Sequence, residues 1–79
     1  MTTANLNAEK VSKFLSTIDM DDWYSIEVKP KNNLIWIQGN MEESLIKKYL
    51  KLGYKPEPMG EYLSFEFKSD GILIRIVLT

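Results

Sequence analysis

Two segments of the chain carry apolar residues at helical spacing. The first begins after Asn7, a good helix cap, and runs to about Ile18. The second follows Asn40, which forms a capping-box variant with Glu43, and we expect it to end at Gly53. The predicted buried stripes are Ala8, Val11, Phe14, Leu15 and Ile18 in the first helix, and Leu45, Ile46, Tyr49, Leu50 and Leu52 in the second.

Four other segments alternate between polar and apolar residues or are densely apolar, as β-strands are. We expect them to form two hairpins, in which residues 24–29 pair with 34–38 and residues 62–68 pair with 72–79. Asp70-Gly71 predicts a type I′ turn in the second hairpin. Because two prolines interrupt residues 54–61, we expect a loop without regular pairing there.

The two halves of this αββαββ order also resemble each other in sequence. Without gaps, residues 24–37 align with 63–76 and share six identities: Ser25/Ser64, Glu27/Glu66, Lys29/Lys68, Leu34/Leu73, Ile35/Ile74 and Ile37/Ile76. The helices correspond as Val11/Ile46, Phe14/Tyr49 and Leu15/Leu50. We interpret this pattern as a structural pseudo-repeat of two αββ units.

A single αββ unit cannot bury its apolar face alone, so the two units should share one sheet. We predict an α+β domain spanning residues 1–79, with residues 1–6 as a flexible arm. Its sheet would be four-stranded and antiparallel, in the order 1-2-4-3 along the chain, with both helices on one face. The alternating strands, 24–29 and 62–68, would be the edges. This arrangement resembles a circularly permuted ferredoxin-like sheet in architecture.

The turns also predict which side chains share a face. The Asp70-Gly71 turn pairs Phe67 with Ile74 and Phe65 with Ile76, and these residues should face the helices. On the opposite face Glu27 then lies beside Trp36, and Glu66 beside Arg75. That face comprises Ser25, Glu27, Lys29, Leu34, Trp36 and Gln38 from the first hairpin, and Ser64, Glu66, Lys68, Leu73, Arg75 and Val77 from the second.

This second face has no helix to cover it and is the candidate working surface. An apolar centre with a tryptophan, an arginine and a polar rim is typical of an interaction hot spot. A structural interpretation competes with it, in which Trp36 shields the sheet, makes a cation–π contact with Arg75, and Glu66 pairs with Arg75. The predicted partner-binding residues are Trp36, Arg75, Leu34, Leu73, Val77, Glu27 and Glu66.

Composition argues against catalysis. The chain has no cysteine and no histidine, and its net charge of −1 provides no field for a polyanion. Asp19, Asp21 and Asp22 are more typical of a turn that ends a helix than of a metal site. We therefore expect no enzyme, no cofactor, no metal and no small-molecule substrate. The start of the chain lacks the pattern of a secretion signal and no segment is long enough to span a membrane, so we expect a cytoplasmic protein.

The sequence thus favours a small protein-binding domain that acts by steric occupancy. Inhibitors, immunity proteins and adaptors, including those encoded by phages and plasmids, are often of this kind. The partner would be a second copy, giving a homodimer, or another protein. Two alternatives stay open: single-stranded nucleic acid stacked on Trp36, and a purely structural homodimer.

Overall fold

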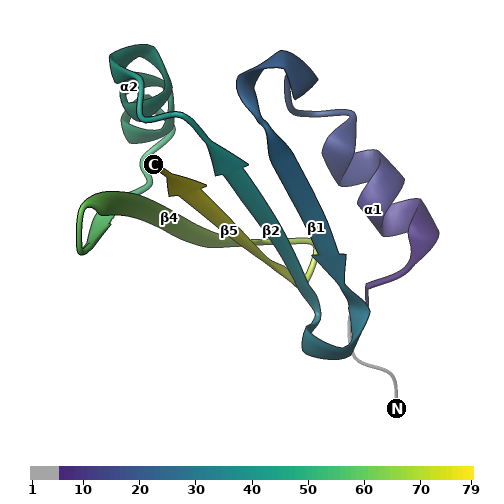
Figure 1. Ribbon diagram of the computed structural model, residues 1–79. Helices are drawn as coiled ribbons and strands as arrows, with labels where there is room; N and C mark the ends of the chain where they lie inside the picture. The colour runs from purple at the N-terminus through teal and green to yellow at the C-terminus, as the bar shows by residue number, and fades with distance from the viewer. Residues whose placement is uncertain (1–5) are drawn as a thin grey trace.

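A computed structural model describes residues 6–79 as two helices above one face of a mixed sheet (Figure 1). The elements, in chain order, are α1 (Ala8–Leu15), the 3-10 turn η1 (Met20–Asp22), β1 (Ser25–Lys29), the 3-10 turn η2 (Pro30–Asn32), β2 (Leu34–Gly39), α2 (Glu43–Lys51), β3 (Glu57–Met59), β4 (Tyr62–Ser69) and β5 (Ile72–Leu78). The α+β class is therefore confirmed. Of the predicted arm, residues 1–5 lie outside the described residues, and Leu6 packs against the core.

The sheet has five strands in the order β1-β2-β5-β4-β3. The predicted order of the four main strands is confirmed, but the wholly antiparallel, ferredoxin-like arrangement is wrong, because β2 and β5 pair in parallel. Each residue of β2 lies beside its repeat equivalent in β5, for example Ile35 beside Ile74 and Ile37 beside Ile76. The residues that align in the two sequence repeats are thus the same residues that lie side by side in the central strand pair.

The parallel centre gives the two hairpins opposite hands. β1 lies outside β2 and β4 lies outside β5, while the central strands run in the same direction and turn equivalent residues to the same face. A two-fold axis perpendicular to the sheet would make the central pair antiparallel. Simple translation of one hairpin onto the other would place β4 between β2 and β5. The pseudo-repeat is therefore one of sequence and local structure, and the two units are not related by rotation.

The segment predicted to be an unpaired loop contributes a fifth strand. β3 pairs with β4, and Pro58 lies opposite Leu63 in that ladder. The strand is tolerated because it lies at the edge of the sheet, where a proline that lacks an N–H group need not interrupt bonding to a second neighbour. The prediction that β4 is an edge strand is therefore wrong over its first residues, because Tyr62 and Ser64 pair with β3.

Both helices are shorter than predicted. Asn7 caps α1, and its side chain accepts a hydrogen bond from the backbone N–H of Lys10. The helix ends at Leu15 because the hydroxyls of Ser16 and Thr17 donate to carbonyls of the last turn, at 2.7 and 2.6 Å.

The predicted cap at Asn40 is wrong for a tertiary reason. The backbone N–H of Met41 donates to the carbonyl of Thr79 at 2.8 Å, and the N–H of Thr79 donates to the carbonyl of Gly39 at 3.0 Å. These bonds continue the pairing of β2 with β5, so the chain stays extended until Glu42 caps α2 without a side-chain bond. At the other end, Gly53 stops the helix with φ +94°, as predicted.

The core lies between the helices and the central strands. Phe14 of α1 and Leu45 and Tyr49 of α2 pack against isoleucines of β2 and β5 and against Phe65 of β4. The two hairpin registers are as predicted. Four residues expected to be buried are exposed instead: Ala8, Val28 (38%), Leu50 (48%) and Leu52 (62%).

A candidate protein-binding face of the sheet

The face of the sheet opposite the helices, called the open face below, is arranged in rows of neighbouring residues. One row runs across four strands as Glu27, Trp36, Arg75 and Glu66, and the next as Lys29, Leu34, Leu73 and Lys68. A third row comprises Ser25, Gln38, Val77, Ser64 and, from β3, Glu57. The predicted site residues thus share one surface, in two adjacent rows and part of the third.

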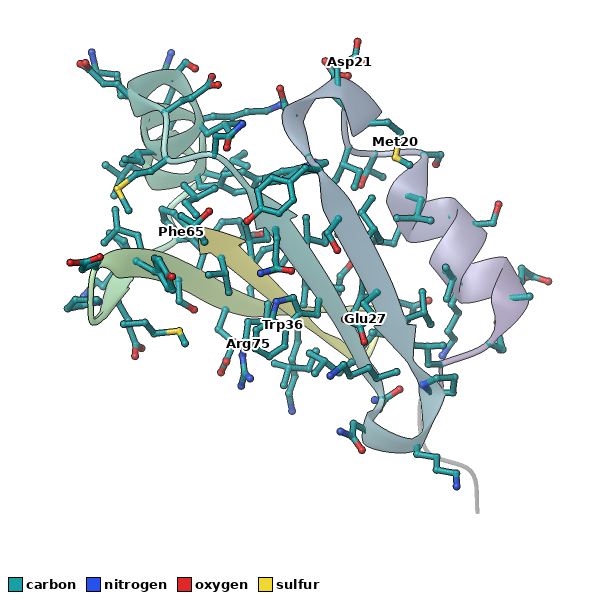
Figure 2. The ribbon with its side chains drawn as sticks, in the orientation of Figure 1. Met20, Asp21, Glu27, Trp36, Phe65 and Arg75 are labelled. Atoms are coloured by element: carbon teal, nitrogen blue, oxygen red, sulfur yellow. The ribbon has the colours of Figure 1, made fainter. Side chains whose placement is uncertain are left out.

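Trp36 is held between two cations. The guanidinium carbon of Arg75 and the ammonium of Lys29 each lie 5.3 Å from the centre of its ring. Such contacts are worth about 0.5–1 kcal/mol each at exposed sites. Figure 2 shows Trp36 and Arg75 next to each other, with Glu27 nearby on β1. The half-buried indole is therefore positioned by its neighbours and does not project freely.

The carboxylates of this row are held unequally. The Nε of Arg75 donates to Glu66 at 2.6 Å, whereas the ammonium of Lys29 lies 3.8 Å from Glu27. The side chain of Glu27 is 62% exposed, against 43% for that of Glu66. The contacts expected from the structural interpretation therefore form within the chain. Of the two glutamates in this row, Glu27 is held less tightly and is more available to a partner.

The apolar floor predicted beneath Trp36 is less accessible than expected. Leu34 and Val77 are only 6% and 2% exposed, and Leu73 is half-buried. Leu34 and Leu73 lie in the row next to that of Trp36 and Arg75, and Val77 lies in the row on its other side. A partner would thus contact Trp36, Arg75 and the charged rim first, with Leu73 as the accessible aliphatic residue.

One end of the open face carries large side chains that the sequence analysis did not assign to it. Met59 pairs with Tyr62, and both are exposed beside the third row. The hydroxyl of Tyr24 lies 2.8 Å from the hydroxyl of Thr79, two residues beyond Val77. The strand alternation of Tyr62 could have placed it here, but Met59 depends on the unpredicted pairing of β3.

The acidic turn has structural partners. The side chain of Asp19 accepts a hydrogen bond from the backbone N–H of Asp21 at 3.1 Å and caps η1, while Asp22 forms an ion pair with Lys48 at 3.4 Å. Within residues 6–79, no three acidic side chains gather in a way that could hold a metal ion. The turn therefore shows no arrangement for cation binding.

A buried aromatic cluster joins this turn to α2. Trp23 packs against Tyr49, with ring centres 6.1 Å apart, and fills the space at Gly39, where a Cβ atom would lie 2.7 Å from the indole. Burial raises the pKa of Tyr49 to about 12, and the negative charge of Asp22 adds to the rise. Tyr49 thus stays protonated to higher pH than an exposed tyrosine, as expected of a hydroxyl in the core.

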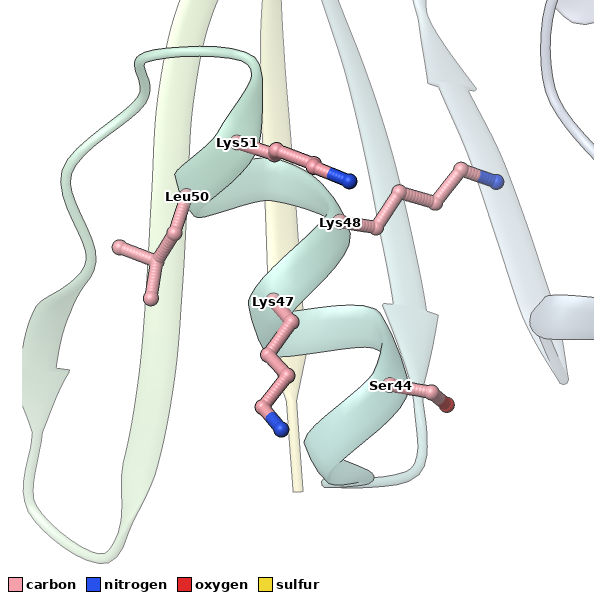
Figure 3. Close-up of a pocket in the computed structure, with 5 residues that line it drawn as sticks. All are labelled: Ser44, Lys47, Lys48, Leu50 and Lys51. Carbon is pink, nitrogen blue, oxygen red and sulfur yellow. The ribbon is translucent and has the colours of Figure 1, made fainter.

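A second surface feature is an open hollow on the outer side of α2 (Figure 3). Two of its three lysines are already paired, Lys47 with Glu43 at 2.8 Å and Lys48 with Asp22. The lining residues are Ser44, Lys47, Lys48, Leu50 and Lys51. Because all of them come from one helix, the hollow has no opposing wall, and the open face remains the better candidate.

Two further findings bear on the kind of protein. None of the helices formed by residues 6–79 has the length and apolar character needed to cross a membrane. Comparisons of the chain with protein-family models, with curated proteins and with solved structures found no match. The geometry and chemistry of the open face therefore provide the basis for inferring a function.

Proposed function

We propose that this chain is a non-enzymatic protein-binding domain that acts by steric occupancy through its open face. The observation that supports it is the composition of that face: a tryptophan and an arginine at the centre of a sheet surface that neither helix covers. Tryptophan and arginine are the residues most enriched in binding hot spots. Roles of this kind are those of inhibitors, immunity proteins and adaptors.

In this proposal each side chain of the open face has a part. Trp36 is the anchor, because its cation–π contacts hold the ring in one orientation and lower the entropy lost on binding. Arg75 is the directional polar contact. Leu34, Leu73 and Val77 supply the apolar surface in the rows beside the anchor, and Glu27 and Glu66 form the rim.

Charge favours a protein partner over a nucleic acid. Lys29, Lys68 and Arg75 lie on the open face with Glu27, Glu66 and Glu57, so cations and carboxylates balance there. Nucleic-acid surfaces need an excess of positive charge to displace counterions from phosphates. A protein with its own mixed charges is the better match.

Affinity capture from an extract of cells that express the protein tests the proposal. The double variant Trp36→Ala/Arg75→Ala should lose the bound protein, because removal of a hot-spot residue costs about 2 kcal/mol or more. The matched control is Lys47→Ala/Lys51→Ala on the outer side of α2, which should retain it. Far-UV circular dichroism checks that both variants fold.

Two results would contradict the proposal. Equal retention of the partner by wild type and by the open-face variant would place the contact elsewhere. Capture that disappears on nuclease treatment would assign the face to nucleic acid, and quenching of tryptophan fluorescence by oligo-U at low salt would confirm that alternative.

A further inference from the structure

The partner-facing charges of the open face form a pattern that is self-complementary. In the row that contains Trp36, both outer strands carry a glutamate, Glu27 on β1 and Glu66 on β4. In the adjacent row, both outer strands carry a lysine, Lys29 and Lys68. The outer strands thus carry two glutamates in one row and two lysines in the next, about 7 Å away along the strands, while Arg75 lies between the glutamates and pairs with Glu66.

Two in-plane two-fold axes could bring two open faces together. An axis parallel to the strands exchanges β1 with β4 and keeps each row in place, so Glu27 would face Glu66 and like charges would repel. An axis across the strands keeps each strand over itself and exchanges the two rows. Each glutamate then faces a lysine.

We infer that the open face binds the same face of a second copy, about a two-fold axis that runs across the strands between these two rows. This inference rests on the proposed function and names its partner. Lys29 then meets Glu27 of the second copy, and Lys68 meets Glu66, twice each by symmetry. The sheets form the inner layers of a sandwich with the helices outside, offset by the usual angle of about 30°.

The centre of the face fits the same arrangement. Exchange of the rows places Trp36 over Leu34 of the second copy and the aliphatic stem of Arg75 over Leu73. Trp36, Leu73 and Arg75 are half-buried in one chain, so they have apolar area left to bury. Among residues 6–79, Lys68 has no ion pair, and the contact supplies one.

The size of the face predicts a weak dimer. About this axis the two exchanged rows face each other, and four strands about 4.8 Å apart with two rows about 7 Å apart offer roughly 270 Å² on each copy. Standard interfaces bury about 800 Å² on each partner. Because the contact is about a third of that size, the dimer should form only at concentrations near the millimolar range, and high salt should weaken it.

Charge reversal on β1 tests the axis. Lys29→Glu alone sets two glutamates against each other across the dimer, and Glu27→Lys alone sets two lysines against each other. Each single variant should dimerise at least about tenfold more weakly than wild type in sedimentation experiments at low salt. An equimolar mixture of the two variants should form a heterodimer, because both contacts on β1 become pairs of opposite charge.

Two controls separate this face from other routes to association. Trp36→Ala lies at the centre of the open face, so it should weaken the dimer about tenfold or more, whereas pairing through the free edge of β1 would be unaffected. Lys51→Glu makes the same charge change on α2. This variant should dimerise as wild type does, and it should not form a heterodimer when mixed with the Glu27→Lys variant. Circular dichroism of each variant confirms the fold.

The outcomes decide between partners. Wild type that stays monomeric up to about 1 mM, or single variants that dimerise as well as wild type, would overturn the second-copy inference. The proposed function would then still stand or fall on affinity capture with the Trp36→Ala/Arg75→Ala variant. A wild-type dimer that Trp36→Ala leaves intact would also overturn it.

Discussion

The two hairpins are similar in sequence and in register, yet they hold different places in the molecule. β1 forms one edge of the sheet, and Val28 on its inner face is 38% exposed. β4, its equivalent, is flanked by β5 and in part by β3, and Phe67, which corresponds to Val28, is half-buried, while Phe65, which corresponds to the partly buried Ile26, is fully buried. Equivalent strands therefore contribute unequally to stability, because burial depends on what packs against a strand as well as on its pattern.

The same inequality appears on the open face. Trp36 and Arg75 are equivalent positions of the repeat, side by side in the central pair. Arg75 forms an ion pair with Glu66 on its own hairpin at 2.6 Å. Trp36 is uncharged and cannot pair in this way with Glu27, which lies 3.8 Å from the ammonium of Lys29. The charged rim residues of the two hairpins are thus identical, whereas the central residues Trp36 and Arg75 differ. The face therefore has both a repeated charge pattern and a single aromatic anchor.

The largest expected difference between the hairpins lies in their inner residues. Phe65→Ala should lower the free energy of unfolding by about 4 kcal/mol, because it leaves a cavity at a fully buried site. Ile26, the equivalent residue on β1, is only partly buried, so Ile26→Ala should cost about 1.5 kcal/mol. Urea denaturation measures both, and equal losses would contradict the ranking of the strands.

The two helices should differ in their response to alkali. The pKa of Tyr49 is raised to about 12 in the folded chain from an ordinary value of 10, so the folded state favours the protonated form. That stabilisation is complete below pH 10, and roughly 2 kcal/mol of it should be lost as the pH rises to 12. The equivalent residue of α1 is Phe14, which does not titrate.

Denaturation at several pH values checks this prediction. Tyr49→Phe should remove this part of the alkaline loss, because it removes the hydroxyl and keeps the ring. If the variant lost stability above pH 10 as steeply as wild type, the loss would arise from other groups.

The smallest expected difference concerns the rim. Glu66→Gln should destabilise the chain by about 0.5 kcal/mol, because it weakens the 2.6 Å contact with Arg75. Glu27→Gln should have a smaller effect, since the contact of Glu27 with Lys29 is long. Thermal unfolding at low and high salt compares them, and only the Glu66 effect should shrink measurably with salt.

Much of the candidate site followed from strand alternation. The Asp70-Gly71 turn has positive φ at both residues, and its register places Glu66 beside Arg75 as predicted. The low exposure of Leu34 and Val77 did not follow, because alternation assigns a side chain to a face but does not specify how far that side chain is exposed. Met59 lies on the face because it belongs to β3. That strand was not predicted, because two prolines interrupt residues 54–61.

The sequence by itself determined the existence of the two helices and the four main strands, the hairpin registers and the face that each strand residue occupies, because these depend on local turn chemistry and on side-chain periodicity. Only the tertiary structure decided that β2 and β5 run in parallel, since both directions satisfy the same alternation. It also decided where α2 begins, because the bond from Met41 to Thr79 joins segments far apart in the chain. Such long-range backbone pairing leaves no local pattern from which it could be predicted.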